Sequence, residues 1–231
     1  MPFASSLLFA AFALFSSDQR AGAFGFARRR QPNTRAALSV SAGEVQVPPA
    51  ATTIGHKDKD RLAAKLIETC RNYGQVGSLL SEQERGEIES LADALSPFSD
   101  CCPARDTLTG QHELVYSASP SASSGKLGPF TGKVTQSFLD ETSFINRVEL
   151  FGGLAKVELN AERKVLDDSR IKVIFRRTDF FLLGKEVKSG EVKGAGIWDY
   201  RFSGIVELNG ERVLLRVMDT PSLFVIIKRE E

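Results

Sequence analysis

Histidine, cysteine and net charge are all scarce in this sequence of 231 residues, and each shortage excludes a class of protein. With 30 basic and 29 acidic side chains the formal net charge is +1, whereas nucleic-acid binding needs a concentrated basic surface. Two histidines and three cysteines are too few for a disulfide framework or a metal site at ligand spacing. We therefore expect no metal, no cofactor and no nucleic acid as a partner.

The few reactive side chains do not form a known catalytic pattern. Beyond the first fifty residues the sequence has no nucleophile motif and no phosphate-binding glycine loop. His112 opens a predicted strand, where we expect an imidazole at the surface or at the edge of the core rather than a catalytic base. Cys70, Cys101 and Cys102 are expected to be buried or idle thiols, with a redox role for the adjacent pair as the alternative.

The first fifty residues have the composition of a targeting segment. Pro2–Phe15 is an apolar run of fourteen residues, too short to span a bilayer but typical of a secretory signal. Residues 21–23, Ala-Gly-Ala, supply the small residues that signal peptidase requires. Residues 24–43 are rich in Arg, Ser, Ala and Thr and contain no acidic side chain, which is typical of an organelle transit peptide.

Together these features resemble the bipartite presequence of algae with secondary plastids, in which a Phe opens the transit part, here Phe24. We expect a signal peptide over residues 1–23, a transit peptide and linker over residues 24–50, and a plastid (chloroplast) location. Secretion with a basic propeptide is the alternative. Without the first fifty residues, which hold five basic and two acidic side chains, 25 basic and 27 acidic ones remain, in a length that suits one domain.

A helical hairpin is predicted over residues 57–97, after a linker that extends to Gly55. Between residues 57 and 73 apolar side chains recur at helical spacing, and Gly74 is placed to end that helix. Ser81 and Glu84 have the spacing of a capping box, which predicts the start of a second helix. Pro97 is expected to end it.

From Thr107 onward, apolar and polar residues alternate with period two in short segments, the pattern of half-buried strands. The predicted strands are 112–117, 133–139, 142–151, 155–159, 170–176, 197–208, 211–218 and 223–228. With no helix between them these strands must pair antiparallel, and a long antiparallel sheet closes to remove its edges. We therefore expect a mainly β fold, with an antiparallel β-barrel over residues 107–231 that forms one domain with the hairpin.

The faces expected to point into the barrel are rich in aromatic side chains. A barrel of about eight strands encloses a space that side chains just fill or that holds one small apolar ligand. The aromatic residues expected inside, and hence the candidate ligand-binding residues, are Tyr116, Phe138, Phe144, Phe175, Trp198, Tyr200 and Phe202.

Residues 108–117 (LTGQHELVYS) resemble a motif of the plastid lipid-associated protein (fibrillin) family. The family has a Leu-x-Gly turn, a Trp two positions after the Gly, then Leu-x-Tyr and a small polar pair. Gly110, Leu114 and Tyr116 match, and His112 stands at the Trp position. Further matching stretches are Gly128-Pro129-Phe130 leading to Gln136, Asn146 to Glu149 and Arg170 to Phe175.

The end of the chain is similar to the family's closing hairpin, in which Leu-Asp-x-x-x-Arg-Ile-x-Arg leads to Leu-Phe-Val. Leu208, Arg216 and residues 223–225 match, whereas Asn209 replaces the Asp and Val213-Leu214 replaces Arg-Ile. The resemblance covers residues 57–229 and implies a lipocalin-like barrel without catalysis, on thylakoids or plastoglobules. It also makes Arg216 a candidate ligand-binding residue. Its side chain either pairs with a carboxylate at the barrel or lies on the strand surface.

Three functions compete on these grounds. The first is a plastid protein whose aromatic-lined interior binds or organises a hydrophobic isoprenoid, quinone or carotenoid. The second is an interaction module whose barrel is filled by side chains and which holds a partner enzyme or a membrane surface. The third is a lipid isomerase or cyclase, which requires Glu149, Glu158 or Asp199 inside the barrel with a perturbed pKa. Lys185, Lys188 and Lys193 predict a solvated hairpin, with contact to anionic lipid as the alternative.

Overall fold

The computed structural model describes residues 49–230, with side chains from residue 55 onward. The chain divides into two compact units, Met1–Lys57 and Asp58–Glu231, and the packing described below is that of the second. The expected signal peptide (residues 1–23) and transit peptide with linker (residues 24–50) lie outside the described residues, except for the last two. No helix in the described part of the chain is both long and apolar enough to cross a membrane.

The first described element, α2 (Pro49–Tyr73), begins earlier than the sequence predicted. The expectation of a linker as far as Gly55 is wrong from Pro49 onward. Proline is well suited to the first turn of a helix, where its missing N–H has no helical partner and its φ angle is already helical. The end is as predicted, because Gly74 adopts a φ of +108° and donates its N–H to the carbonyl of Cys70 at 2.9 Å.

The second helix, α3 (Glu82–Leu95), begins at the predicted capping box. The N–H of Ser81 donates to the Glu84 carboxylate at 2.7 Å, and the N–H of Glu84 donates to the Ser81 hydroxyl at 3.3 Å. Pro97 lies in the 3-10 turn η2 (Ser96–Phe98) that directly follows the helix. The predicted pair of helices before the strands is therefore confirmed.

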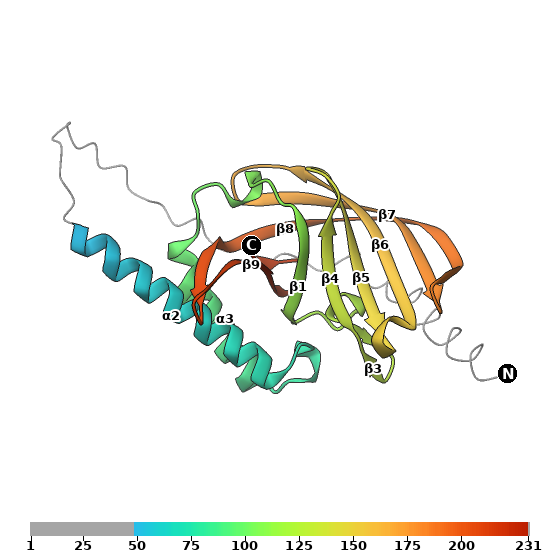
Figure 1. Cartoon of the computed structure of the whole chain (residues 1–231), viewed down its shortest axis with the longest axis horizontal. Coiled ribbons are helices and arrows are strands. Elements are labelled where there is room, and N and C mark those ends of the chain that lie inside the picture. The colour runs from blue at the N-terminus through green and yellow to red at the C-terminus, as the bar shows by residue number, and fades with distance from the viewer. Residues whose placement is uncertain (1–48, 231) are drawn as a thin grey trace. The chain divides into compact units, whose positions relative to one another are not determined.

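Eight antiparallel strands close into a barrel in the order β1-β10-β9-β8-β7-β6-β5-β4, which confirms the mainly β class (Figure 1). The barrel strands are β1 (Gly110–Ser117), β4 (Lys133–Phe138), β5 (Ser143–Leu150), β6 (Ala155–Val165), β7 (Arg170–Leu182), β8 (Lys185–Leu208), β9 (Glu211–Asp219) and β10 (Leu223–Arg229). The short elements are η1 (Gly77–Leu79), η3 (Pro103–Arg105), η4 (Ala122–Ser124), η5 (Phe151–Gly153) and the small sheet of β2 (Lys126–Leu127) with β3 (Phe130–Thr131).

The longest strand, β8, has different neighbours along its length. Residues 185–199 pair with β7, whereas pairing with β9 begins at Asp199 and continues to Leu208. The first part of β8 therefore extends beyond the end of β9. Most of its residues before Trp198 are exposed, on both faces of the strand.

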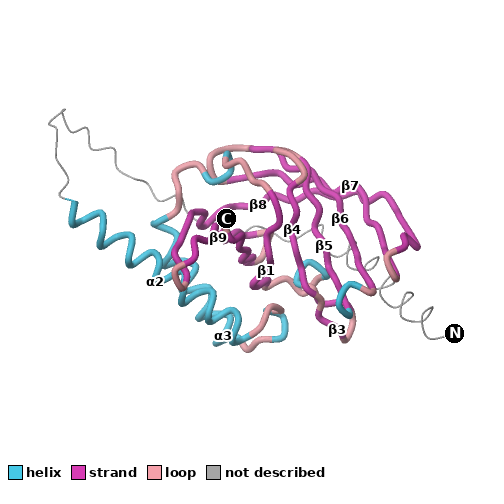
Figure 2. The backbone as a smooth tube through the Cα atoms, in the orientation of Figure 1, coloured by secondary structure: helices cyan, strands magenta, loops and turns pink. Residues whose placement is uncertain are grey.

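The barrel wall separates two apolar clusters. The outer cluster lies between the helices and the outward faces of β1, β8, β9 and β10, and includes Leu66, Ile88 and Val217. The inner cluster lies inside the barrel and includes Phe144, Trp198 and Met218. In the tube view the helices run outside the curved strands, next to β9 (Figure 2).

Two of the aromatic residues expected inside the barrel belong to the outer cluster instead. Tyr116 and Phe202 are 1% and 0% exposed and pack under the helices. The cause is a β-bulge in each strand, where one extra residue, Val115 in β1 and Arg201 in β8, reverses the alternation of side chains. Tyr116, Val225, Val217 and Phe202 consequently form one outward row across four strands.

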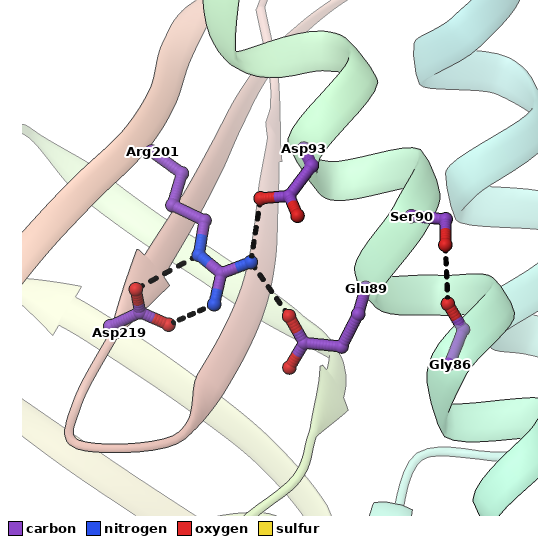
Figure 3. Close-up of polar contacts among 6 residues, drawn as sticks. All are labelled: Gly86, Glu89, Ser90, Asp93, Arg201 and Asp219. Carbon is purple, nitrogen blue, oxygen red and sulfur yellow. Dashed lines mark hydrogen bonds and ion pairs between the residues drawn. The ribbon is translucent and has the colours of Figure 1, made fainter. Parts of the chain in front are cut away.

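The bulge residue Arg201 ties the barrel to helix α3 (Figure 3). Its guanidinium donates to both carboxylate oxygens of Asp219, at 2.9 and 2.7 Å. It also donates to Glu89 at 2.6 Å and to Asp93 at 3.2 Å, both on α3. The bulge therefore turns Phe202 toward the helices and supplies the charge that binds them.

Candidate functional site

The barrel interior contains a continuous line of aromatic side chains. The ring centroids of Phe138 and Phe144 are 5.4 Å apart, those of Phe144 and Trp198 5.8 Å, and those of Trp198 and Phe224 6.2 Å. Strands β4, β5, β8 and β10 supply these rings, so the line crosses the barrel. Phe175 is partly buried and packs against the same cluster. Phe138, Phe144, Phe175 and Trp198 thus lie where the sequence predicted.

Arg216 lies in the middle of this apolar interior and is fully buried. Its Nη1 donates to the side-chain carbonyl of Gln136 at 3.0 Å, and its Nη2 donates to the hydroxyl of Tyr200 at 2.8 Å. The guanidinium carbon lies 5.3 Å from the centre of the Phe138 ring. Of the two positions the sequence left open for Arg216, the structure places it inside.

The partners of Arg216 are neutral, which is unusual for a buried guanidinium. No carboxylate is among its hydrogen-bond partners, and its Nε has no partner at all. A buried charge that is not matched by an opposite charge costs several kcal/mol in desolvation. The carboxylate pairing considered from the sequence is therefore not the arrangement found. The interior instead retains an unused hydrogen-bond donor.

A second arginine lies near Arg216. Arg163 on β6 is 7% exposed and donates to the backbone carbonyls of Glu141 and Asp106, at 2.7 and 2.8 Å. Its Nη1 has no partner. Burial lowers the pKa of Arg163, and the nearby charge of Arg216 lowers it further. Two like charges thus share one buried region.

The carboxylate that both arginines influence belongs to Asp106, in the segment before β1. Burial and then the charge of Asp100 raise its pKa, whereas the Ser203 hydroxyl and the two arginines lower it. The Ser203 hydroxyl lies 3.4 Å from its Oδ2. Asp106 therefore partly balances the charge of the arginines, without a direct ion pair to Arg216.

His112 is fully buried in the barrel, so the expectation of a surface or core-edge position is wrong. Its ring meets Phe138 edge-on, with centroids 5.1 Å apart. Neither ring nitrogen makes a hydrogen bond of good geometry. Burial, and then the charges of Arg216 and Lys228, lower its pKa from 6.5 to about 3, so the ring is neutral at pH 7.

Sequence reasoning missed Gln136 and Arg163 as members of this cluster. Gln136 is 1% exposed and also donates to the Asn146 side chain at 3.0 Å. It stands midway between Val134 and Phe138 in the period-two pattern, and that spacing could have identified it. Arg163 lies beyond the predicted end of its strand, because β6 extends to Val165.

The three carboxylates considered for acid–base catalysis lie on the outer wall. Glu149, Glu158 and Asp199 each alternate with inward-facing neighbours, so they point away from the interior. Glu158 is bonded to Arg147 at 2.9 Å and to Lys156 at 2.9 Å. None of them can reach a ligand held inside the barrel.

Metal-binding clusters and reactive thiols do not add chemistry to the interior. In the described part of the chain, no three His, Cys, Asp or Glu side chains lie close enough together to hold a metal ion. Cys70 is buried in the outer cluster, Cys101 is exposed and Cys102 is half-buried. Burial raises the pKa of Cys70 to about 12.

Fold and site define a small antiparallel β-barrel with an aromatic interior and a buried, incompletely satisfied arginine cluster. A family model, PAP_fibrillin, matches residues 60–198. The chain belongs to this family, the plastid lipid-associated proteins. No curated protein and no solved structure gave a significant match. The matched segment includes α2 from residue 60, all of α3 and the strands from β1 into β8, so the family extends over the barrel wall that carries Phe138, Phe144 and Trp198.

Proposed function

We propose that this protein binds or organises a hydrophobic lipid of the isoprenoid, quinone or carotenoid type at thylakoids or plastoglobules, without catalysis. Membership of the plastid lipid-associated family supports the general class. The observation that best supports a bound ligand is Arg216, a buried donor with an unused N–H among aromatic side chains. Apolar walls with a few fixed polar groups are the usual composition of a small-molecule site.

The arginine cluster suggests which part of the ligand lies deepest. Nη1 of Arg163 and Nε of Arg216 have no hydrogen-bond partner, and neither do the ring nitrogens of His112. An oxygen on a ring or chain, such as a quinone carbonyl or a hydroxyl, accepts such hydrogen bonds without the full desolvation cost of an anion. The isoprenoid part then lies along the aromatic line from Phe138 to Trp198.

One observation favours the rival function, in which the barrel is filled and a partner or a membrane surface is held outside. The aromatic rings from Phe138 to Phe224 touch in sequence across the interior. A ligand therefore enters only if these rings turn aside. The two functions differ in whether a lipid stays with the purified protein.

Mass spectrometry of lipids that co-purify with the protein decides between them. We expect a prenylated lipid with the wild type and a large loss of it in Trp198→Leu. The matched control is Phe202→Leu, a buried aromatic residue on the same strand that faces the helices. A wild-type protein free of lipid after expression in a plastid-bearing host contradicts the carrier function and supports the filled barrel.

We also propose that residues 1–50 direct the chain to a secondary plastid through a signal peptide followed by a transit peptide. Phe24 is the residue on which this depends most. In a tagged presequence, Phe24→Ala should leave entry into the secretory route intact and abolish plastid import. Phe26→Ala is the matched control, and equal import of both variants contradicts the proposal.

A further inference from the structure

Two turns at one end of the barrel expose large apolar side chains. In the loop between β5 and β6, Phe151 and Leu154 are 50% and 54% exposed. In the turn between β7 and β8, Leu183 is 70% exposed, the highest value among the large apolar side chains described. The Leu183 N–H donates to the Leu154 carbonyl at 2.8 Å, so the two turns lie side by side.

The backbone conformation of these two turns does not favour the large apolar residues found in them. Phe151, Leu183 and Asn209 have φ angles of 53°, 51° and 53°, and each precedes a glycine that also has positive φ. Asn-Gly is the usual pair for such turns, because Asn tolerates the left-handed region and larger side chains do not. Asn209 follows this rule at the opposite end of the barrel, whereas Phe151 and Leu183 break it.

Neighbouring aromatic and basic side chains extend this surface. The ring of Phe130 on β3 meets Phe151 edge-on with centroids 5.0 Å apart, and β3 lies beside the ends of β5 and β6 in Figure 1. Lys185 follows the turn directly and is exposed. Neither turn contains an acidic residue: the sequences are Phe-Gly-Gly-Leu over 151–154 and Leu-Leu-Gly-Lys over 182–185.

The other end of the barrel also exposes apolar side chains, but with opposite charge around them. Leu139 is 64% exposed and is followed by Asp140 and Glu141. Leu166 is 45% exposed and is followed by Asp167 and Asp168, which pair with Arg170 and Arg105 at 2.6 Å, so the contrast in charge rests on the tip at Leu139. An anionic surface repels the tip at Leu139 and attracts Lys185, because Glu186 beside that lysine pairs with Arg177 at 3.5 Å. The charges thus distinguish two ends that have similar apolar exposure.

We propose that the tips formed by Phe151, Leu154 and Leu183 insert into the surface of an anionic lipid layer, with the barrel axis directed into it. This inference rests on the lipid association in the proposed function, and it names the surface and the orientation. The outer wall formed by β5, β6 and β7 is less suited to this role. It is covered by ion pairs such as Arg147 with Glu158 and Arg176 with Glu162. Exposed apolar patches mark sites of membrane or protein contact, and a basic side chain beside one is attracted to anionic lipid.

Tryptophan scanning at two positions tests the orientation directly in the full chain. Leu183→Trp and Leu139→Trp place a new indole at opposite ends, and the buried Trp198 is common to both. The probes are vesicles of phosphatidylcholine and phosphatidylglycerol in which the phosphatidylcholine is brominated. We expect strong quenching of Leu183→Trp and none of Leu139→Trp beyond the wild type. Equal quenching at both ends, or none at either, overturns the proposal.

A second pair of variants separates insertion from folding. Leu183→Asn suits the left-handed backbone, so it should keep or raise the melting temperature while it removes the inserted side chain. Full burial of one leucine corresponds to roughly tenfold to a hundredfold in partition, and we expect a loss of at least about tenfold in vesicle flotation. Leu139→Asn is the control and should float as the wild type does. All chains carry the same residues 1–48, so any contribution of that segment is equal throughout.

The outcomes are distinguishable from those of the proposed ligand function. Trp198→Leu should lose the co-purifying lipid and still float with vesicles, whereas Leu183→Asn should keep the lipid and float weakly. A Leu183→Asn chain that floats as well as the wild type overturns the docking surface, whatever lipid the barrel retains. Concentration-dependent self-association that Leu183→Asn abolishes, without vesicle binding by the wild type, also overturns it and indicates a protein contact.

Discussion

Arg201 holds Asp219 through two parallel hydrogen bonds, at 2.9 Å from Nε and 2.7 Å from Nη2 (Figure 3). Paired bonds of this kind fix both position and orientation of the two groups. The same guanidinium bonds Glu89 and Asp93 on α3, and the Arg201 side chain is only 13% exposed. One bulge residue therefore joins β8, the end of β9 and the helix α3.

Replacing Arg201 by leucine should lower the free energy of unfolding by about 3 kcal/mol, because it leaves a partly buried carboxylate without its partner. Urea denaturation measures the change. The control is Arg176→Leu, which removes an exposed pair with Glu162 and should cost less than about 1 kcal/mol. Equal costs for the two variants would contradict the role of Arg201 as the link to α3.

Acid should destabilise the protein through His112. The pKa of this buried imidazole is about 3 in the folded chain and about 6.5 when unfolded, so below pH 6.5 only the unfolded chain takes up the proton. The associated stability is complete above pH 6.5 and is lost as the pH falls toward 3. Between pH 7 and pH 4 the loss should be about 3 kcal/mol.

His112→Leu should remove this part of the acid sensitivity while leaving the contribution of the carboxylates unchanged. Urea midpoints of the wild type and the variant at pH 7 and pH 4 give the difference. The prediction fails if both chains lose the same stability on acidification.

Two glycine substitutions should have opposite effects on stability. A Cβ at Gly77 would lie 2.9 Å from the backbone of Ala118 and 2.7 Å from the Tyr116 ring, and it would also meet the Tyr116 hydroxyl. Gly77→Ala should therefore cost about 1–3 kcal/mol by overpacking. A Cβ at Gly86, within α3, would meet nothing within 4 Å, so Gly86→Ala should stabilise by about 0.5–1 kcal/mol. Thermal melting measures the effect of each substitution. Melting temperatures that shift in the same direction in both variants would contradict this prediction.

Arg216→Met separates a ligand-binding arginine from a structural one. Because the wild-type guanidinium is buried against neutral partners, an apolar side chain of similar length should leave the stability unchanged or raise it by about 1 kcal/mol. The same variant should lose the co-purifying lipid. A large drop in melting temperature would instead show that Arg216 is retained for the fold.

Thiol labelling should distinguish the three cysteines. Cys101 is exposed and should react quickly, and half-buried Cys102 more slowly. Cys70, whose pKa burial raises to about 12, should react only on unfolding. Labelling of Cys70 at the rate of Cys101 in the native protein would contradict its position in the outer cluster.

Local sequence signals predicted the elements of this fold well and the faces of two strands badly. Ser81 and Gly74 mark helix ends through short-range hydrogen bonds and backbone freedom, and a single sequence contains both signals. The bulges at Val115 and Arg201 depend on pairing with β10 and β9, which a strand's own residues do not reveal. For Tyr116 and Phe202 the sequence pattern therefore predicts the wrong side of the barrel wall.

The candidate site was predictable only in part, for a related reason. Phe138, Phe144 and Trp198 are apolar residues in regular alternation, so their inward position follows from the period alone. Arg216 shares the inward parity of Met218, but a charged side chain is expected at the surface unless its partners are known. Those partners come from strands far away in sequence, since Gln136 lies on β4 and Tyr200 on β8.

The first part of β8 extends beyond the end of β9, and this affects the tendency of the protein to aggregate in solution. Residues 185–198 present an edge whose backbone groups β9 does not use, and such an edge is a template for aggregation between copies. Any flat apolar stretch there is interrupted by Lys185, Lys188 and Lys193 and by the glycines among them. Charged residues in such positions oppose edge-to-edge pairing between copies. Neutralising those lysines should shorten the time that the folded protein remains dispersed on storage, even where its melting temperature does not change.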